Sequence, residues 1–484
     1  MDIRSEVDAR RQTVQRALEP GTQEAFGQHF TPAITGDLMA GMLDLAALDG
    51  TVRILDPGTG VGSLTVSLIH RLRTERPDLS LHVTAVEVDP QLVPHLAQTL
   101  AACEAYGRVK TEVITEDFLT SEEPRMRGPF DLVIANPPYG KLARNSDQRK
   151  HTALRTIDTP NRYSAFWAES VAALAPGGQI VIIVPRSWAN GAYFTAFREW
   201  LLSQVGLDNL LVFESRDSVF ADSGVLQENV VVSMTKGPQS PTVTMHAALK
   251  HGAEVEHRTV PFDVVVRPED RYKFVRFTDG EVVVPPASSY TLADLGITAS
   301  TGKVVDFRNR DLLTPTPQPD TVPMIYQAHI RPTGVDHRLS ARGKPSWFRI
   351  GISAADKLTV PAGTYVLIKR FSSKEEKHRV VAGVWESEAP TAFDNKTNYL
   401  HSDGRGLDPA LARGLVLWLN STILDDVFRT FSGHTQVNAT DLRILPFPDI
   451  DTLVRLAHLA PDTIPGQDDL DRLVDKVLSE ADAT

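Results

Sequence analysis

The residues best suited to chemistry form the turn Asn136-Pro137-Pro138-Tyr139. Asn136 offers an amide oxygen and Pro137 a carbonyl oxygen, and the prolines stiffen the backbone that carries both. An exocyclic amine on a heteroaromatic ring is a poor nucleophile because its lone pair is delocalised into the ring. Two acceptors that bind both amine hydrogens favour a pyramidal nitrogen with a localised lone pair. Tyr139 supplies a flat face for stacking, so the turn predicts a site that activates an aromatic amine.

A glycine-rich turn is the second chemical signal, and residues 56–62 read Asp-Pro-Gly-Thr-Gly-Val-Gly. Glycines at 58, 60 and 62 let the backbone approach a ligand with no Cβ in the way. Their Gly-x-Gly-x-Gly spacing differs from the Gly-x-Gly-x-x-Gly of dinucleotide binding. The loop also has no lysine to meet a phosphate. The turn therefore predicts a ligand other than a nicotinamide dinucleotide.

Two further acids follow predicted strands downstream of this turn. Glu87 can accept hydrogen bonds from both hydroxyls of a ribose, and Asp117 beside Phe118 can bind and sandwich an adenine ring. With Asp56, they place three acids at the ends of consecutive strands. The set predicts an adenosine ligand that carries a charged tail and no phosphate.

The elements that must position these residues alternate between strand and helix. We expect strands at residues 52–56, 82–89, 109–116, 130–135, 179–185, 209–214 and 228–234. Helices are expected at residues 61–73, 91–103, 164–174 and 194–203. This alternation predicts an α/β fold with a mainly parallel sheet and helices on both faces. Ligands of such sheets bind at the carboxyl ends of the strands, where the acids and both turns fall.

The composition changes at residues 237–241, which read Gly-Pro-Gln-Ser-Pro and are interpreted as a linker. Short strand-like runs at 364–368 and 380–385 and helical stretches at 408–420 and 453–459 follow in an irregular pattern. We therefore predict two domains, residues 1–240 and a mixed α/β domain of residues 241–484.

Composition limits the classes of protein to which the chain can belong. It has 484 residues, of which 42% are hydrophobic and 23% charged, a profile that excludes wholesale disorder. A single cysteine, Cys103, excludes an internal disulfide framework and zinc sites built from paired cysteines. We find no signal peptide and no apolar run long enough to span a membrane, and expect a cytoplasmic protein.

The charge distribution indicates a polyanionic partner although the net charge is −11. Residues 303–379 hold fourteen basic and seven acidic residues, and residues 141–162 hold six basic and two acidic residues. Basic stretches of this kind create local fields that attract polyanions.

Together the motifs resemble those of amino-directed S-adenosylmethionine methyltransferases, and within them the TaqI-like (gamma-order) adenine-specific DNA methyltransferases of type II restriction–modification systems. An upstream segment, residues 28–32 (Gln-His-Phe-Thr-Pro), resembles the extra cofactor motif of this group. The order of segment, glycine loop, Asn-Pro-Pro-Tyr turn and large C-terminal domain also matches. The resemblance implies a Rossmann-like catalytic domain followed by a target-recognition domain.

The resemblance implies that S-adenosylmethionine is the cofactor. Thr31 and the glycine loop would hold its methionine part with Asp56 close to the amino group, Glu87 its ribose, and Asp117 with Phe118 its adenine. The residues expected to bind the cofactor are Phe30, Thr31, Asp56, Gly58, Gly60, Gly62, Glu87, Asp117 and Phe118.

The implied reaction is in-line attack of the adenine N6 amine on the sulfonium methyl group, with no metal. The target base must leave the DNA stack. The catalytic residues would be Asn136, Pro137, Pro138 and Tyr139, and Phe220 would stack on the second face of the base, opposite Tyr139.

Double-stranded DNA is the expected partner, with the C-terminal domain reading its sequence. Arginine and lysine side chains pair with guanine edges, and glutamine and asparagine side chains pair with adenine edges. Cationic side chains also contact phosphates. The contacts expected on these grounds are Lys141, Arg144, Lys369, Arg370, Gln436 and Asn438.

Other functions fit parts of the pattern. The same chemistry could methylate the N4 amine of cytosine, although the motif order and the leading Asn favour adenine. Glutamine methylation of release factors uses a similar turn, but those enzymes lack a large domain after the catalytic one. A non-catalytic DNA specificity subunit is the alternative of another class, yet Asp56, Glu87 and Asn136 are all present. No nuclease motif is found, so a restriction endonuclease that shares the site would be a separately encoded partner.

Overall fold

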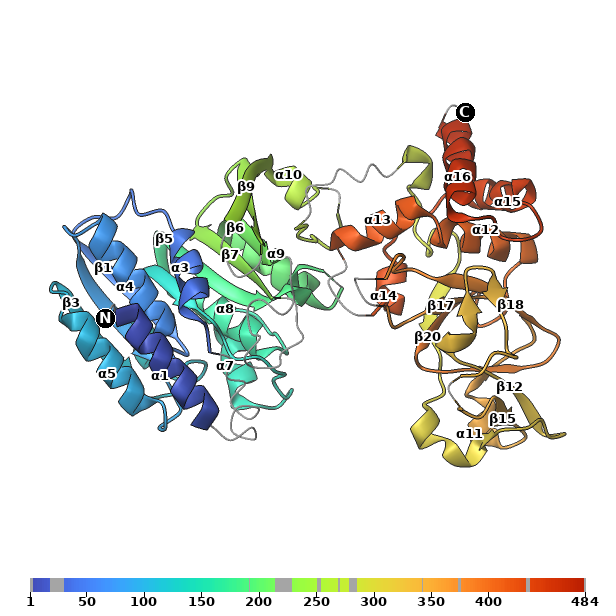
Figure 1. Ribbon diagram of the computed structural model, residues 1–484, viewed down its shortest axis with the longest axis horizontal. Helices are drawn as coiled ribbons and strands as arrows, with labels where there is room; N and C mark the ends of the chain where they lie inside the picture. Colours follow the sequence, from blue (N-terminus) through green and yellow to red (C-terminus); the bar gives the residue numbers. More distant parts are fainter. Residues whose placement is uncertain are drawn as a thin grey trace. The chain divides into compact units, whose positions relative to one another are not determined.

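The computed structural model divides the chain into two compact units, Met1–Asp279 and Gly280–Thr484 (Figure 1). Each unit is described on its own. The structure describes residues 3–17, 30–190, 192–213, 229–249, 254–268, 270–277, 285–341, 343–372, 376–431 and 436–482.

A nine-stranded sheet in the order β3-β2-β1-β4-β5-β7-β6-β8-β9 forms the centre of the first unit. Its strands are β1 (Thr51–Pro57), β2 (Ser80–Val86), β3 (Val109–Ile114), β4 (Phe130–Ala135), β5 (Leu174–Pro185), β6 (Val205–Phe213), β7 (Asn229–Lys236), β8 (Thr242–Leu249) and β9 (Glu254–Pro261).

The first five strands run parallel to one another, and β6 runs parallel to β8. Strand β7 lies antiparallel between β5 and β6, and β9 is antiparallel at the edge. The predicted α/β class with a mainly parallel sheet is thus confirmed. The chain builds outward from β1 through β2 to β3 and then returns to β4 on the other side of β1. The order of strands therefore reverses between β1 and β4, where open α/β sheets bind ligands.

Helices cover both faces of this sheet. The helices of the unit are α1 (Ile3–Ala17), α3 (Ala33–Gly41), α4 (Ser63–Glu75), α5 (Val93–Glu104), α6 (Glu123–Arg127), α7 (Asp147–Arg155), α8 (Arg162–Ala173), α9 (Thr195–Gln204) and α10 (Phe262–Val265). Figure 1 shows α1, α4 and α5 lying together over β1 to β3.

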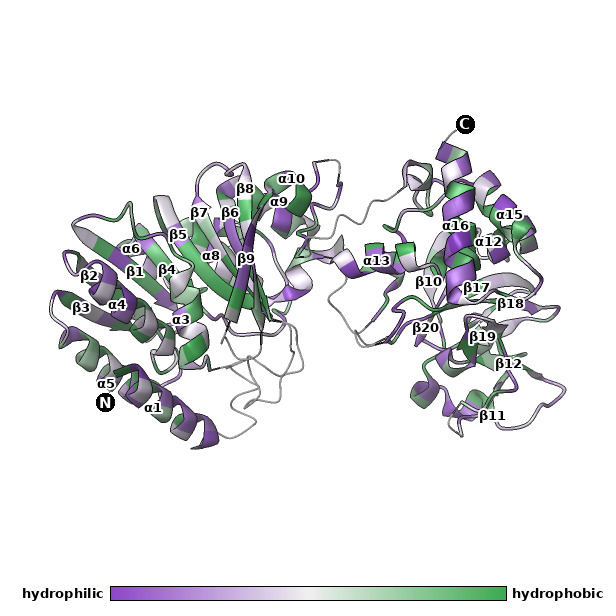
Figure 2. Cartoon of the chain, turned by 45° about the horizontal axis from the view of Figure 1, so that its top comes forward, coloured by the Kyte–Doolittle hydropathy of each residue, from purple (hydrophilic) through white to green (hydrophobic). Residues whose placement is uncertain are grey.

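Strand β5 shows why the sheet needs cover on both sides. Ile180 and Ile182 belong to the core cluster that includes α8 and α9, whereas Val181 and Ile183 belong to the cluster of α1, α3 and α4. Alternate residues of a strand point to opposite faces, so a continuous apolar run is buried twice. Strand β9 differs from the apolar β5, because it carries hydrophilic residues and lies at the edge of the sheet (Figure 2).

The predicted domain boundary after residue 240 is wrong. Residues 237–241 make a turn between β7 and β8, and β8 then pairs with β6 in the same sheet. The boundary between the units follows Asp279. Glycine and proline mark a turn at this point, not a linker between domains.

The second unit combines three small sheets with C-terminal helices. A four-stranded sheet has the order β10-β20-β17-β18, a five-stranded sheet the order β11-β15-β12-β19-β16, and β13 pairs with β14. The strands are β10 (Thr298–Thr301), β11 (Leu313–Thr314), β12 (Thr321–Ile325), β13 (Ile330–Arg331), β14 (Gly334–Val335), β15 (Trp347–Arg349), β16 (Thr359–Val360), β17 (Gly363–Lys369), β18 (Ala382–Ser387), β19 (Thr391–Phe393) and β20 (Thr397–His401).

The helices of this unit are α11 (Ser353–Asp356), α12 (Pro409–Leu419), α13 (Thr422–Phe431), α14 (Ala439–Leu442), α15 (Ile450–Leu459) and α16 (Gln467–Asp482). Helix α12 begins where Asp408 accepts hydrogen bonds from two backbone N–H groups, with proline at its first position. It shares a core with α15, α16 and the four-stranded sheet. In the described parts of the chain, no helix is long and apolar enough to cross a membrane.

Candidate active site

The glycine loop joins β1 to α4 and is tied to the next strand. The backbone N–H groups of Gly58 and Thr59 both donate to the carbonyl oxygen of Val86, and Gly60 donates to Glu87 Oε2 at 2.7 Å. Gly60 has a φ of +62°, which glycine adopts without strain. The loop is therefore held open over the end of β2 by the acid that follows that strand.

Gly62 shows the closest packing in the loop. Its φ is +91°, and a Cβ built on it would lie 2.8 Å from Thr99 Cγ2 on α5. Any side chain here would push α4 and α5 apart. Gly62 thus allows α4 to begin directly behind the loop.

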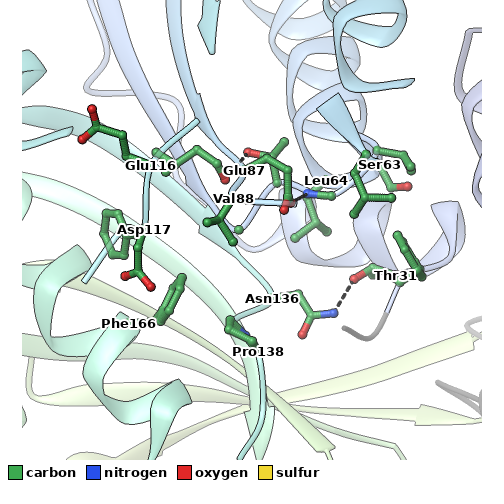
Figure 3. Close-up of a pocket in the computed structure, with 18 residues that line it drawn as sticks. Thr31, Ser63, Leu64, Glu87, Val88, Glu116, Asp117, Asn136, Pro138 and Phe166 are labelled. Atoms are coloured by element: carbon green, nitrogen blue, oxygen red, sulfur yellow. Dashed lines mark hydrogen bonds between the residues drawn. The ribbon is translucent and has the colours of Figure 1, made fainter. Parts of the chain in front are cut away.

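One pocket opens at the point where the strand order reverses. Figure 3 shows Thr31, Glu87, Asp117, Asn136 and Phe166 arranged around it. Its lining brings together the predicted cofactor residues Phe30, Thr31, Gly58, Gly60, Glu87, Asp117 and Phe118, and the predicted catalytic residues Asn136 and Pro138.

Glu87 is a buried carboxylate at the centre of this arrangement. It accepts backbone hydrogen bonds from Gly60 and, at 2.8 Å, from Asp89. Burial raises the pKa of Glu87 above its ordinary value, and the hydrogen bonds counteract that rise. Hydroxyl groups of a ligand would further favour the ionised form.

Asp56 is fully buried at the end of β1 and is not among the lining residues. Thr65 Oγ1 donates to its Oδ2 at 2.6 Å, while Oδ1 has no hydrogen-bond partner among the described residues. Burial raises the pKa of Asp56 to about 7, and the nearby Glu87 carboxyl adds to the rise. A cationic ligand group in the loop would stabilise the ionised carboxylate.

An apolar slot occupies the other end of the pocket. The rings of Phe118 and Phe166 lie 5.1 Å apart, and Val88 lines the pocket with 44% of its surface exposed. A flat ligand ring would cover this exposed surface. Beside it, Asp117 accepts hydrogen bonds from the backbone N–H of Leu119 and from the Gln148 side chain at 2.5 Å.

The proline turn places Asn136 at the edge of the pocket, directly after β4. Asn136 Nδ2 donates to Thr31 Oγ1 at 2.8 Å, so its amide orientation is set by the segment before α3 (Figure 3). That orientation directs the amide nitrogen to Thr31, and the amide oxygen is the atom of this side chain that can accept hydrogen bonds.

Tyr139 is held beyond the pocket lining. Its hydroxyl donates to Asn229 Oδ1 at 2.8 Å, and its ring packs edge-on against Tyr163. Three predicted site residues are neighbours of lining residues in the sequence but do not line the pocket themselves: Gly62, Pro137 and Tyr139. Phe220, the predicted second stacking residue, lies outside the described residues.

Several pocket residues were not predicted. Phe166 comes from α8, Glu116 precedes Asp117, and Leu92 precedes α5. Glu116 could have been found from its position after β3. Phe166 gave no separate signal, because an aromatic residue on a helix is normally a core residue.

In the second unit, a groove brings together two of the predicted DNA contacts, Arg370 and Asn438, with Lys303 and Arg443. All three cations donate hydrogen bonds to backbone carbonyl oxygens. Asn438 also donates to Asp441 at the start of α14.

The other predicted contacts lie outside this groove. Lys369 ends β17, where burial lowers its pKa, and Gln436 bridges to Phe371. In the first unit, Lys141 and Arg144 are exposed directly after the proline turn. Arg149, predicted to belong to the same basic stretch, forms an ion pair with Asp158.

The described residues contain no group of three or more histidine, cysteine or acidic side chains placed to hold a metal ion. The pocket itself is lined by carboxylates, an amide, backbone N–H groups and aromatic rings.

Comparison with known proteins identifies the family. Residues 79–220 match the model of the Eco57I restriction-modification methylase family. The chain is 38% identical to the type II methyltransferase M.BsuBI of Bacillus subtilis, over 98% of this chain and 97% of that protein. It is 34% identical to the type II methyltransferase M.PstI of Providencia stuartii, over 93% and 92% of the two chains.

Among solved structures, the type IIL restriction-modification enzyme MmeI, determined in complex with DNA, has a TM-score of 0.58. It is 12% identical over 89% of this chain and 70% of that one, so it supports the fold alone. The relatives are methyltransferases, and the predicted cofactor, S-adenosylmethionine, is confirmed by them. At this identity and coverage, the chain belongs to the type II methyltransferases of restriction–modification systems.

Proposed function

We propose that the protein transfers a methyl group from S-adenosylmethionine to the N6 amine of an adenine in a specific DNA sequence. The observation that carries this proposal is Asn136, whose amide is oriented by Thr31 at the edge of the cofactor pocket. An acceptor at this point can bind a substrate amine beside the methyl donor.

The pocket fits S-adenosylmethionine in both charge and shape. Glu87 would accept the ribose hydroxyls, and the slot of Val88, Phe118 and Phe166 would hold the adenine ring. The glycine loop and Thr31 would receive the methionine part, with Asp56 attracting its amino group from the end of β1. When bound, the cofactor supplies an electrophilic methyl group.

The chain's own residues would orient the attacking amine. The oxygen of Asn136 and the carbonyl of Pro137 would accept its two hydrogens, which localises the nitrogen lone pair for in-line attack. Catalysis by this means rests on positioning and on hydrogen bonding. Tyr139, and Phe220 on the opposite face, would stack on the base after it leaves the helix, and each stacked base is worth about 1–3 kcal/mol.

Adenine is favoured over cytosine by the Asn that leads the turn and by the order of the motifs. Cytosine N4 methylation is the competing function, because the same turn could bind that amine. A double-stranded DNA substrate is supported by membership of the family of type II methyltransferases.

We further propose that the second unit reads the target sequence. The groove of Lys303, Arg370, Asn438 and Arg443 offers cations for phosphates or guanine edges and an amide for adenine. Lys369 and Gln436 would add contacts nearby, and Lys141 and Arg144 would hold phosphates around the extruded nucleotide. A cytoplasmic location and a separately encoded endonuclease with the same site complete the proposal.

The test is transfer of a radiolabelled methyl group to unmethylated plasmid DNA, followed by digestion to nucleosides. We expect label only in N6-methyl-2′-deoxyadenosine. Asn136→Ala should reduce transfer by at least about a hundredfold while the calorimetric affinity for S-adenosylmethionine stays within about threefold. Label in N4-methylcytosine would overturn the choice of base, and full activity of Asn136→Ala would overturn the assigned turn.

A further inference from the structure

The hydroxyl of Tyr139 has a defined partner outside the pocket, on a strand that is distant in sequence. Asn229 Oδ1 accepts its hydrogen bond at 2.8 Å, and the two residues are 4% and 9% exposed, respectively. Burial raises the pKa of Tyr139, so its hydroxyl remains a donor throughout the neutral range. The transfer proposed above uses the face of this ring and does not use its hydroxyl proton.

Asn229 is a rigid support for this bond. It is the first residue of β7 and pairs with Pro185, the last residue of β5. Strand β7 is hydrogen-bonded on both sides, to β5 and β6, and lies two places from β4. The bond from Tyr139 therefore crosses the end of β5 and joins the catalytic turn to the interior of the sheet.

The second contact of the ring restricts it in another direction. Tyr163 from α8 packs against Tyr139 with a ring separation of 6.3 Å and an angle of 77°. An edge contact alone allows a ring to tilt, whereas a hydrogen bond at the far end of the side chain also fixes its tip. The plane of Tyr139 is thus set by a helix on one side and by β7 at its hydroxyl.

We propose that Asn229 is a positioning residue for methyl transfer, which holds the ring of Tyr139 in the plane that stacks on the target base. The inference rests on the function proposed above and extends it to a residue outside the pocket and the proline turn. Loss of the Asn229 side chain would remove the acceptor of the buried Tyr139 hydroxyl, and the Tyr139 ring would then move toward another acceptor.

The test is a double-mutant cycle on a synthetic duplex that carries the site methylated by the wild-type protein. Asn229→Leu removes the acceptor, and we expect kcat to fall about tenfold to hundredfold. KM for DNA and Kd for S-adenosylmethionine should change by less than about threefold. Tyr139→Phe should lose less activity, and adding it to Asn229→Leu should restore at least about half of the lost activity on a logarithmic scale, because no hydroxyl then lacks a partner.

Asn209→Val is the matched control. Asn209 also bonds across this sheet, to Ser233 and His246, but it does not contact Tyr139. If Asn229→Leu does not fold, Asn229→Ser, which is too short to reach the hydroxyl, takes its place with the same expected loss.

The outcomes separate the two proposals. A wild-type protein that methylates no DNA contradicts the proposed function. An active wild-type protein with an Asn229 variant that behaves like Asn209→Val, or with losses that simply add in the double variant, overturns the role of Asn229 alone.

Discussion

The environment of Asp56 makes the stability of the fold depend on pH. Burial raises its pKa to about 7, against about 3.9 in an unfolded chain. Between these values the folded state holds a proton that the unfolded state has lost, so the free energy of unfolding falls as pH rises from about 4 to about 7. Asp56→Asn keeps an acceptor for Thr65 but cannot ionise.

We therefore expect the stability of Asp56→Asn relative to wild type to increase by about 2–4 kcal/mol between pH 4.5 and pH 7.5. Urea unfolding of both proteins at the two pH values measures this difference. A relative stability that does not change with pH would show that Asp56 ionises as an ordinary carboxyl in the fold.

At the scale of elements, the junction of the glycine loop with α4 depends on Gly62. Gly62→Ala would combine a left-handed backbone with a contact of 2.8 Å to Thr99 Cγ2. We expect a loss of about 2–4 kcal/mol in the free energy of unfolding, since such backbone strain alone costs about 1–3 kcal/mol. Chemical denaturation measures it.

Two variants separate the causes of this loss. Thr99→Ser removes the clashing methyl group and keeps the hydroxyl that binds Arg10, so it should recover part of the stability lost in Gly62→Ala. Gly50→Ala controls for the backbone, because Gly50 has a φ of +62° with open space around it. Equal losses at the two glycines would mean that the contact with α5 is unimportant.

Elements with a strong local pattern were predictable, and those defined by distant partners were not. Strand β4 was predicted at the residues where it is found, and the strand ends located most of the pocket. Strand β8 was missed because residues 237–241 were interpreted as a linker, and β9 because its polar residues, at the edge of the sheet, resemble a loop sequence. Phe166 and the partner of Tyr139, 90 residues away, depend on tertiary packing that no local pattern contains.

At the scale of the whole molecule, the sheet determines where the first unit ends. Strand β8 pairs with β6, and Val243, Met245 and Val265 belong to the core cluster of α8 and β5. A fragment of residues 1–279 should therefore fold and bind S-adenosylmethionine within about threefold of the full chain, without methylating DNA at a specific sequence. A fragment of residues 1–240 should aggregate, since it exposes β6 and part of that core.

Circular dichroism, calorimetry and a methylation assay on the two fragments test this division. Sequence-specific methylation by residues 1–279 would contradict the proposed role of the second unit. A stable, cofactor-binding fragment of residues 1–240 would instead support the domain boundary predicted after residue 240.

Whether the protein methylates adenine at a specific DNA sequence can be measured by expressing it in a host without adenine methylation and mapping modified bases by single-molecule sequencing. We expect N6-methyladenine at one short recurrent sequence, and no such mark with Asn136→Ala. Modified cytosine at the recurrent site, or a genome without modified bases although the purified protein binds S-adenosylmethionine, would contradict it.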